Sequence, residues 1–126
     1  MVNKTFATAI NCIDGRVQCP VTHWLKDNLK VDYVDMITEP GMDKLMAEGS
    51  LSAREAIRLK VMISVNVHDS HVIAVVGHDD CAGNPVSQEA HLKQIRRGVD
   101  AVKTWTRGIE VLGLWVNESW EVEKVV

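Results

Sequence analysis

The sequence predicts an α/β protein with a mainly parallel β-sheet, helices on both faces and an antiparallel strand at the C-terminal edge. Two observations support this class. Apolar runs of strand length alternate along the chain with segments of helical periodicity, which is typical of βαβ units. In addition, residues 72–77 are continuously apolar, as in strands of a parallel sheet that is covered on both faces.

The first half of the chain predicts a strand, a helix and a second strand. Residues 6–12 form a short apolar run, and residues 33–38 form another. Between them, Pro20 opens a segment whose apolar side chains have helical spacing. Those side chains are Val21, Trp24, Leu25 and Leu29. The second strand ends at the turn signal of residues 39–41, and a less regular stretch follows to Gly49.

Two further helices are predicted in the second half of the chain. Ser52 and Glu55 have the spacing of a capping box, and the helix they begin, to about residue 68, is apolar on most sides. This helix is therefore expected to be well buried. Asn84 and Pro85 have the residue types of an N-cap and a first helical position, and an amphipathic helix follows them.

The last segments predict two strands that form a hairpin. Residues 109–116 are an apolar run, residues 117–119 a turn, and residues 120–125 a short strand. The hairpin places an antiparallel strand at one edge of the sheet. The chain has 126 residues with no internal repeat and no linker, so a single domain over residues 1–126 is predicted.

Composition excludes several classes of function. Fourteen Lys and Arg against 17 Asp and Glu give a net charge of −3, so neither nucleic acid nor an anionic membrane is an expected partner. No apolar stretch approaches the roughly 18 residues of a membrane span. The sequence start lacks the long apolar region of a secretion signal, and a cytoplasmic location is expected. Three cysteines in such a reducing compartment are expected to be buried, metal-bound or redox-active.

Metal-binding and ionisable side chains follow two of the predicted strands. Cys12, Asp14 and Arg16 follow the first strand, and His78 and Cys81 follow the third. Ligands of open α/β sheets bind beyond the carboxyl ends of the strands. Two thiolates and an imidazole suit Zn²⁺, and three protein ligands leave its fourth position open, as in catalytic sites. The sequence therefore predicts a zinc site formed by Cys12, His78 and Cys81.

The pattern Cys-x-Asp-x-Arg after the first strand, with Gly-His-x-x-Cys after a later one, resembles the β-class carbonic anhydrases. The resemblance covers most of the chain, including the closing hairpin. It implies a β-carbonic-anhydrase-like fold with zinc on Cys12, His78 and Cys81, and a catalytic dyad of Asp14 and Arg16. It further implies a zinc-dependent lyase that hydrates CO₂ reversibly to bicarbonate, and a homodimer or higher homo-oligomer.

The role of Asp14 and Arg16 can also be argued from chemistry. Zinc lowers the pKa of a bound water to about 7, which gives hydroxide at neutral pH. An ionised Asp14 can hold the hydroxide proton so that a lone pair faces the CO₂ carbon, and Arg16 favours the ionised form. In a second, closed state, which the resemblance also implies, Asp14 itself takes the fourth zinc position. Both states stay open at this point.

The chain departs from the family pattern, and alternatives follow. Residues 38–42 replace a loop that helps to line the family's active site, and Gly15 stands where the family commonly has Ser. One alternative is hydrolysis of carbonyl sulfide or carbon disulfide. Another is a non-catalytic zinc protein in which Asp14 closes the site. A redox role for Cys12 and Cys19 is the third.

Other candidate residues are expected to have no part in zinc binding. Cys19 precedes the proline of the first helix and is expected to be a passive cysteine. Four histidines are expected at the surface or at helix ends, although two of them, His68 and His71, are also candidates for a proton shuttle. The four are His23, His68, His71 and His91.

Overall fold

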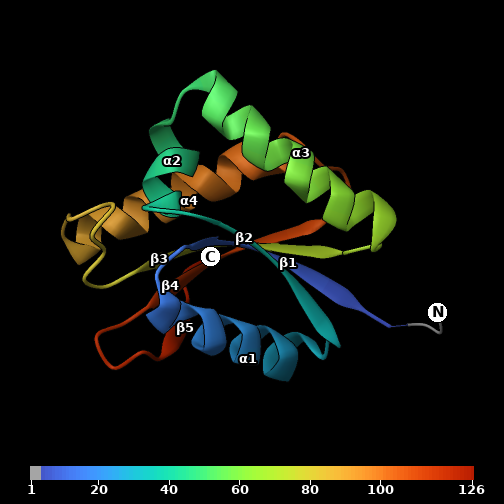
Figure 1. Ribbon diagram of the computed structural model, residues 1–126, viewed down its shortest axis with the longest axis horizontal. Coiled ribbons are helices and arrows are strands. Elements are labelled where there is room, and N and C mark those ends of the chain that lie inside the picture. Colours follow the sequence, from blue (N-terminus) through green and yellow to red (C-terminus); the bar gives the residue numbers. More distant parts are fainter. Residues whose placement is uncertain (1–3) are drawn as a thin grey trace.

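A computed structural model describes residues 4–126 of the chain. Five strands form one sheet in the order β2-β1-β3-β4-β5 (Figure 1). Strands β1 to β4 are parallel, and β5 is antiparallel to β4. The strands are β1 (Phe6–Cys12), β2 (Tyr33–Glu39), β3 (Val72–His78), β4 (Glu110–Val116) and β5 (Val122–Lys124). The predicted sheet, with its antiparallel edge strand, is confirmed.

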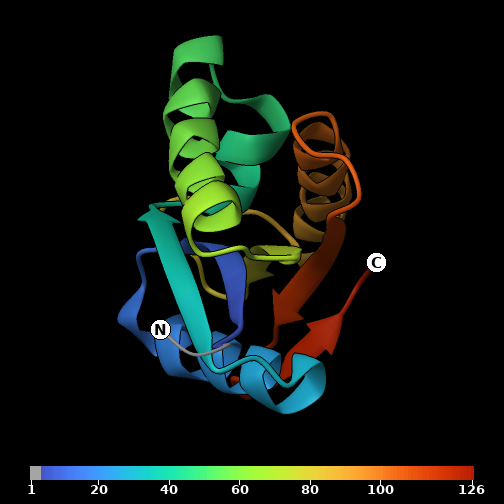
Figure 2. The same cartoon turned by 90° about the vertical axis from the view of Figure 1, so that its right-hand side faces the viewer.

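Helices cover both faces of this sheet, as predicted. Figures 1 and 2 show that the helix after β1 lies on one face of the sheet, and that the helices after β2 and β3 lie on the other. The helix after β1 is α1 (Gln18–Leu29), which a short 3-10 helix, η1 (Gly15–Val17), joins to β1. The helices on the other face are α2 (Met42–Glu48), α3 (Leu51–Val67) and α4 (Gln88–Lys103). None of the helices among the described residues combines the length and hydropathy of a membrane span.

The alternation of side chains along each strand builds two hydrophobic cores. In β1, Ala7 and Ala9 face the core under α1, whereas Ile10 faces the core under the other helices. All seven residues of β3 are buried, because both of its faces are covered. In β3, Val76 belongs to the core on the α1 side, so His78 at the strand end points to that side as well.

The predicted capping box of α3 is wrong by two residues. The helix begins at Leu51, and its N-cap is Ser50, whose Oγ accepts a hydrogen bond from the Ala53 amide at 3.2 Å. Ser52 lies inside the helix, and Glu55 pairs with Arg58 at 2.6 Å instead of reaching back. Two serines with the right residue type stand close together, so the sequence pattern alone does not choose between them.

Two other helix starts differ from the prediction. The stretch before Gly49, expected to be irregular, contains α2, which lacks a side-chain cap because Gly41 is its N-cap residue. Helix α4 begins after Ser87, whose Oγ accepts from the Ala90 amide at 3.2 Å. Asn84 is therefore not the N-cap, and its side chain is buried elsewhere.

One side of α3 is exposed and apolar, contrary to the prediction of a buried helix. Leu59, Ile63 and Val67, which we call the α3 stripe, are 55%, 58% and 71% exposed. Their spacing of four residues places them on one side of the helix. The opposite side packs Ile57 and Val61 into the core. Helix α3 therefore has two apolar sides, one packed in the core and one exposed at the surface.

Gly77 fills a position where a side chain does not fit. A Cβ atom there would lie 2.5 Å from Asp43 Oδ2 and 2.9 Å from Ile95 Cδ1. Gly77→Ala is expected to destabilise the fold by about 1–3 kcal/mol, because the buried neighbours must shift. Gly15→Ala is the matched control, since nothing lies within 4 Å of a Cβ at Gly15. Chemical denaturation of both variants tests this, and equal stabilities would contradict it.

Candidate metal centre

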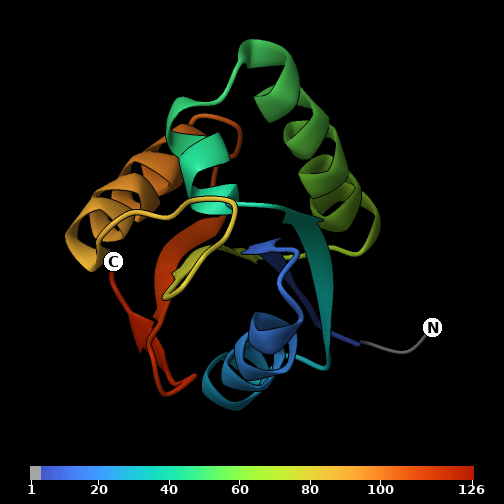
Figure 3. The same ribbon diagram turned by 60° about the vertical axis from the view of Figure 1, so that its left-hand side comes forward.

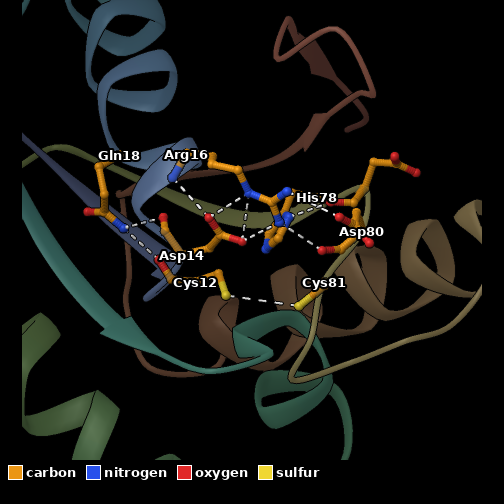
Figure 4. Close-up of polar contacts among 8 residues, drawn as sticks. Cys12, Asp14, Arg16, Gln18, His78, Asp80 and Cys81 are labelled. Atoms are coloured by element: carbon orange, nitrogen blue, oxygen red, sulfur yellow. Dashed lines mark hydrogen bonds and ion pairs between the residues drawn. The ribbon is translucent and has the colours of Figure 1, made fainter.

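The predicted zinc ligands come together at the carboxyl ends of β1 and β3. These strands are adjacent and parallel (Figure 3), with Ile10 opposite Val75. Their last residues, Cys12 and His78, therefore lie at the same edge of the sheet (Figure 4). Cys81 joins them from the loop after β3. All three residues are buried, and their ligand atoms lie within 4.8 Å of one another.

The geometry of this group fits a tetrahedral metal. The Cys12 and Cys81 sulfurs are 3.9 Å apart, and zinc–sulfur bonds of about 2.3 Å at a tetrahedral angle require about 3.8 Å. His78 Nδ1–H donates to the Asp79 carbonyl at 2.7 Å. Its Nε2 therefore carries the lone pair, and this buried atom has no hydrogen-bond partner among the described residues. A second nitrogen fixed by a carbonyl is typical of histidines that bind metals.

The two thiols differ in acidity. Burial raises the pKa of Cys12, but the His78 imidazole in its protonated form and the backbone amides of Asp14 and Gly41 outweigh burial and lower that pKa to about 7. Burial and the neighbouring Cys12 raise the pKa of Cys81 to about 11. Two thiolates this close repel each other, so a cation is needed to keep both sulfurs deprotonated. The donor set thus fits a divalent, thiolate-binding ion such as zinc.

The loop after β2 lies against the loop that carries Cys81. Gly41 has a φ of +61°, and a Cβ there would lie 2.6 Å from the Gly83 carbonyl oxygen. On the other side of this contact, the Gly41 backbone amide lowers the pKa of the Cys12 thiol. The loop after β3 acts similarly, because the backbone amides of Gly83 and Asn84 lower the pKa of the Cys81 thiol and so oppose part of the effect of burial. Backbone amides of two glycine-containing loops therefore favour the deprotonated form of the two thiols.

Asp14 and Arg16 form a close ion pair beside the centre (Figure 4). Arg16 Nη2 donates to Asp14 Oδ2 at 2.7 Å, and Arg16 Nε donates to Oδ1 at 3.0 Å. The Arg16 backbone amide adds a bond to Oδ1 at 2.9 Å. Hydrogen bonding to Arg16 lowers the pKa of Asp14 to about 2. Asp14 is thus ionised at neutral pH, and its carboxylate is held by Arg16 outside the ligand group.

Arg16 has further partners that the sequence did not indicate. Its Nη1 donates to Asp80 Oδ2 at 3.1 Å, and its Nη2 donates to the Asp80 carbonyl at 3.0 Å. The guanidinium also lies 4.6 Å from the centre of the Trp120 ring. Apart from these Arg16 contacts, Gln18 Nε2 donates to the Cys12 carbonyl at 2.6 Å, a second interaction that the sequence did not indicate. Asp80 stands inside the Gly-His-x-x-Cys motif, whereas no sequence signal marks Trp120.

The remaining candidate residues lie outside this group. Cys19 is exposed. His68 stacks on Phe6, with ring centres 4.3 Å apart, and so lies at the opposite end of β1 from Cys12. His71 precedes β3 and is likewise at its far end, so neither histidine is placed to carry protons at the centre. His91 lies in the first turn of α4, at a helix end as expected, but it is not at the surface, because it is only 1% exposed.

The chain is similar to known proteins over its whole length. A protein-family model described as "Putative carbonic anhydrase" matches residues 2–126. No curated protein matches the sequence. β-Carbonic anhydrase isoform I of Trichomonas vaginalis matches with a TM-score of 0.69 and 14% identity, over 100% of this chain and 86% of that one.

Two further solved structures share the fold. For the carbonic anhydrase of Streptococcus mutans, the TM-score is 0.66 and the identity 14%, over 95% of this chain and 81% of that one. For an apo form of carbon disulfide hydrolase, the TM-score is 0.64 and the identity 14%, over 97% and 78%. At 14% identity, these similarities show that the chain shares the fold of these proteins, and they show nothing about its activity.

Proposed function

This chain belongs to that carbonic anhydrase family, and on this premise we propose that it is a zinc-dependent lyase that hydrates CO₂ reversibly to bicarbonate. One observation carries the proposal: beside an ion-paired carboxylate, two thiols converge with an imidazole nitrogen that has no hydrogen-bond partner in the described part of the chain. Cys12, His78 and Cys81 would hold the zinc. Zinc there would supply Lewis-acid activation of water near neutral pH.

Asp14 is proposed to orient the attacking water, and Arg16 to orient Asp14. An ionised carboxylate accepts hydrogen bonds and does not donate them, so Asp14 can fix where a water proton points. Arg16 satisfies both carboxylate oxygens from one side and keeps the charge in place. Moving Asp14 onto the metal would break these bonds. Their number supports an open site over the non-catalytic alternative in which Asp14 closes it.

A second candidate reaction is hydrolysis of carbon disulfide or carbonyl sulfide. The observation that favours it is the shared fold with a carbon disulfide hydrolase. Like CO₂, both molecules are small and linear with an electrophilic carbon. The same residues would therefore serve all three substrates, and only the substrate that is turned over separates the reactions.

Stopped-flow CO₂ hydration tests the proposed function. The protein is assayed at verified zinc content from mildly acidic to alkaline pH, with parallel assays of carbon disulfide and carbonyl sulfide. We expect CO₂ hydration that increases with pH, because deprotonation of the activated water comes with a pKa near 7. Zinc-loaded protein that hydrates no CO₂ at any pH would reject the hydratase. Turnover of a sulfur substrate in its place would establish the second candidate.

The proposed enzyme is a homodimer in which two copies pack through the α3 stripe. This stripe runs beside β2, the edge strand, and Ile63 lines a hollow between the two elements. A second copy would cover both the exposed apolar side chains and the free strand edge. Ile63→Lys is expected to convert the dimer to a monomer, measured by light scattering after size exclusion.

Val86→Lys is the control for that experiment, since Val86 is also an exposed apolar residue, at 42%, but lies in the loop before α4. This variant is expected to stay dimeric. A wild-type protein that runs as a monomer would reject the homodimer. A dimer that survives Ile63→Lys would place the interface on another surface.

A further inference from the structure

A cluster of buried polar side chains lies on the face of β3 opposite to His78. Asp43 of α2, Asn84 of the loop after β3 and His91 of α4 are each 1% exposed. His91 Nδ1–H donates to Asp43 Oδ2 at 2.5 Å. The Asn84 amide nitrogen donates to Asp43 Oδ1 at 3.0 Å and to Gln94 Oε1 at 2.6 Å. Both Asp43 oxygens are thus bonded by donors from other elements.

This cluster touches the candidate metal centre at two points. Asp43 Oδ2 packs against Gly77, the residue before His78, where a Cβ would lie only 2.5 Å away. Asn84 belongs to the loop that carries Cys81, and its backbone N–H donates to the Cys81 carbonyl at 3.2 Å. The Asn84 side chain is therefore anchored by Asp43, and its backbone contacts a proposed zinc ligand.

The hydrogen bonds of the cluster leave one group unpaired. A carboxylate only accepts, so the Asn84 nitrogen must face Asp43, and Asn84 Oδ1 is buried without a partner among residues 4–126. An unpaired buried oxygen costs stability, whereas apolar residues of the same shape would fill the space without that cost. Packing alone therefore does not explain why these polar residues are buried here. A need to hold the Cys81 loop in one position does explain it.

We propose that Asp43 and His91 are positioning residues for the metal centre: they fix Asn84, and Asn84 fixes the loop that presents Cys81. This role rests on the proposed function, because it needs a metal at Cys12, His78 and Cys81. Groups that orient metal ligands from outside the ligand set change metal affinity by about 10–100-fold when they are lost. A loss in this range is expected when the cluster is broken.

Zinc affinity of the full chain tests the proposal, measured by competition with a chromophoric chelator. Asp43→Asn keeps the size of the side chain but turns an amide donor toward the donors of His91 and Asn84. It is expected to bind zinc about 10–100-fold more weakly and to change the visible spectrum of the Co²⁺-substituted protein. His91→Gln, which keeps a donor, is the second variant if Asp43→Asn does not fold, and its loss should be smaller.

Ser64→Ala is the matched control. Ser64 is 2% exposed and bonds to Thr8 and Asp35, near the starts of β1 and β2 and so away from the metal centre. This control is expected to lower the melting temperature and leave zinc affinity unchanged. Asp43→Asn and His91→Gln that bind zinc as tightly as a zinc-binding wild type, with the same Co²⁺ spectrum, would overturn the positioning role alone. Wild-type protein that binds no zinc would overturn the proposed function and this role together.

Discussion

Replacing His78 with Ala is expected to abolish stoichiometric zinc binding and, with it, CO₂ hydration. His78 supplies the one nitrogen of the group, and its Nε2 has no hydrogen-bond partner within residues 4–126. The variant would leave two sulfurs 3.9 Å apart with no third ligand. The loss of affinity should exceed the roughly 10–100-fold that removal of an outer partner costs. Metal analysis after dialysis against a weak chelator measures it.

His23→Ala is the control for this experiment. His23 is an exposed residue of α1, so the same substitution there should change neither zinc content nor activity. Because His78 is buried, Cys81→Ser provides a second variant that keeps the shape of the side chain. Its oxygen is a poorer partner for zinc than a thiolate, so zinc content should again fall. Retention of one zinc per chain in both variants would show that the metal binds elsewhere.

The grouping of Cys12, His78 and Cys81 could be predicted because its signals are local. Cys12 and His78 are the last residues of strands that the apolar pattern identifies, and Cys81 follows the second of these strands by three residues. Strands joined by helical crossovers are parallel, so their carboxyl ends share an edge. The fold class rests on the same two facts. Where a feature depends on residues that are only a few positions apart in the chain, the structure agrees with what the sequence predicts.

The surroundings of the centre could not be predicted because they depend on packing between distant segments. Asp43 and His91 are 48 positions apart in the chain and meet only when α2 and α4 pack together. Asn84 has the residue type of an N-cap, yet its side chain bonds to Asp43 instead. The exposure of the α3 stripe could not be predicted either. An apolar helix side predicts that it packs against something, but not whether that partner is the same chain or a second copy.

Asp14→Asn is expected to reduce the rate of CO₂ hydration by about 10²–10⁴-fold while the zinc is retained. This range is what a positioned proton acceptor contributes to catalysis. Asn has almost the same shape, but one of its two terminal groups donates instead of accepting, and it carries no charge for Arg16 to hold. Asp14 is not among the three grouped ligands, so metal analysis should still find one zinc per chain.

Asp80→Asn makes the matched comparison, because Asp80 also bonds to the Arg16 guanidinium, at 3.1 Å. The Asp80 side chain is 77% exposed, against 18% for Asp14. An exposed ion pair contributes about 0–1 kcal/mol, so this variant should lose no more than about 5-fold in rate. Trp120 and the Asp80 carbonyl would still hold the guanidinium. Equal losses in the two variants would mean that Arg16 placement limits the rate and that Asp14 has no separate role. A large loss confined to Asp14→Asn would assign the proton acceptor to Asp14.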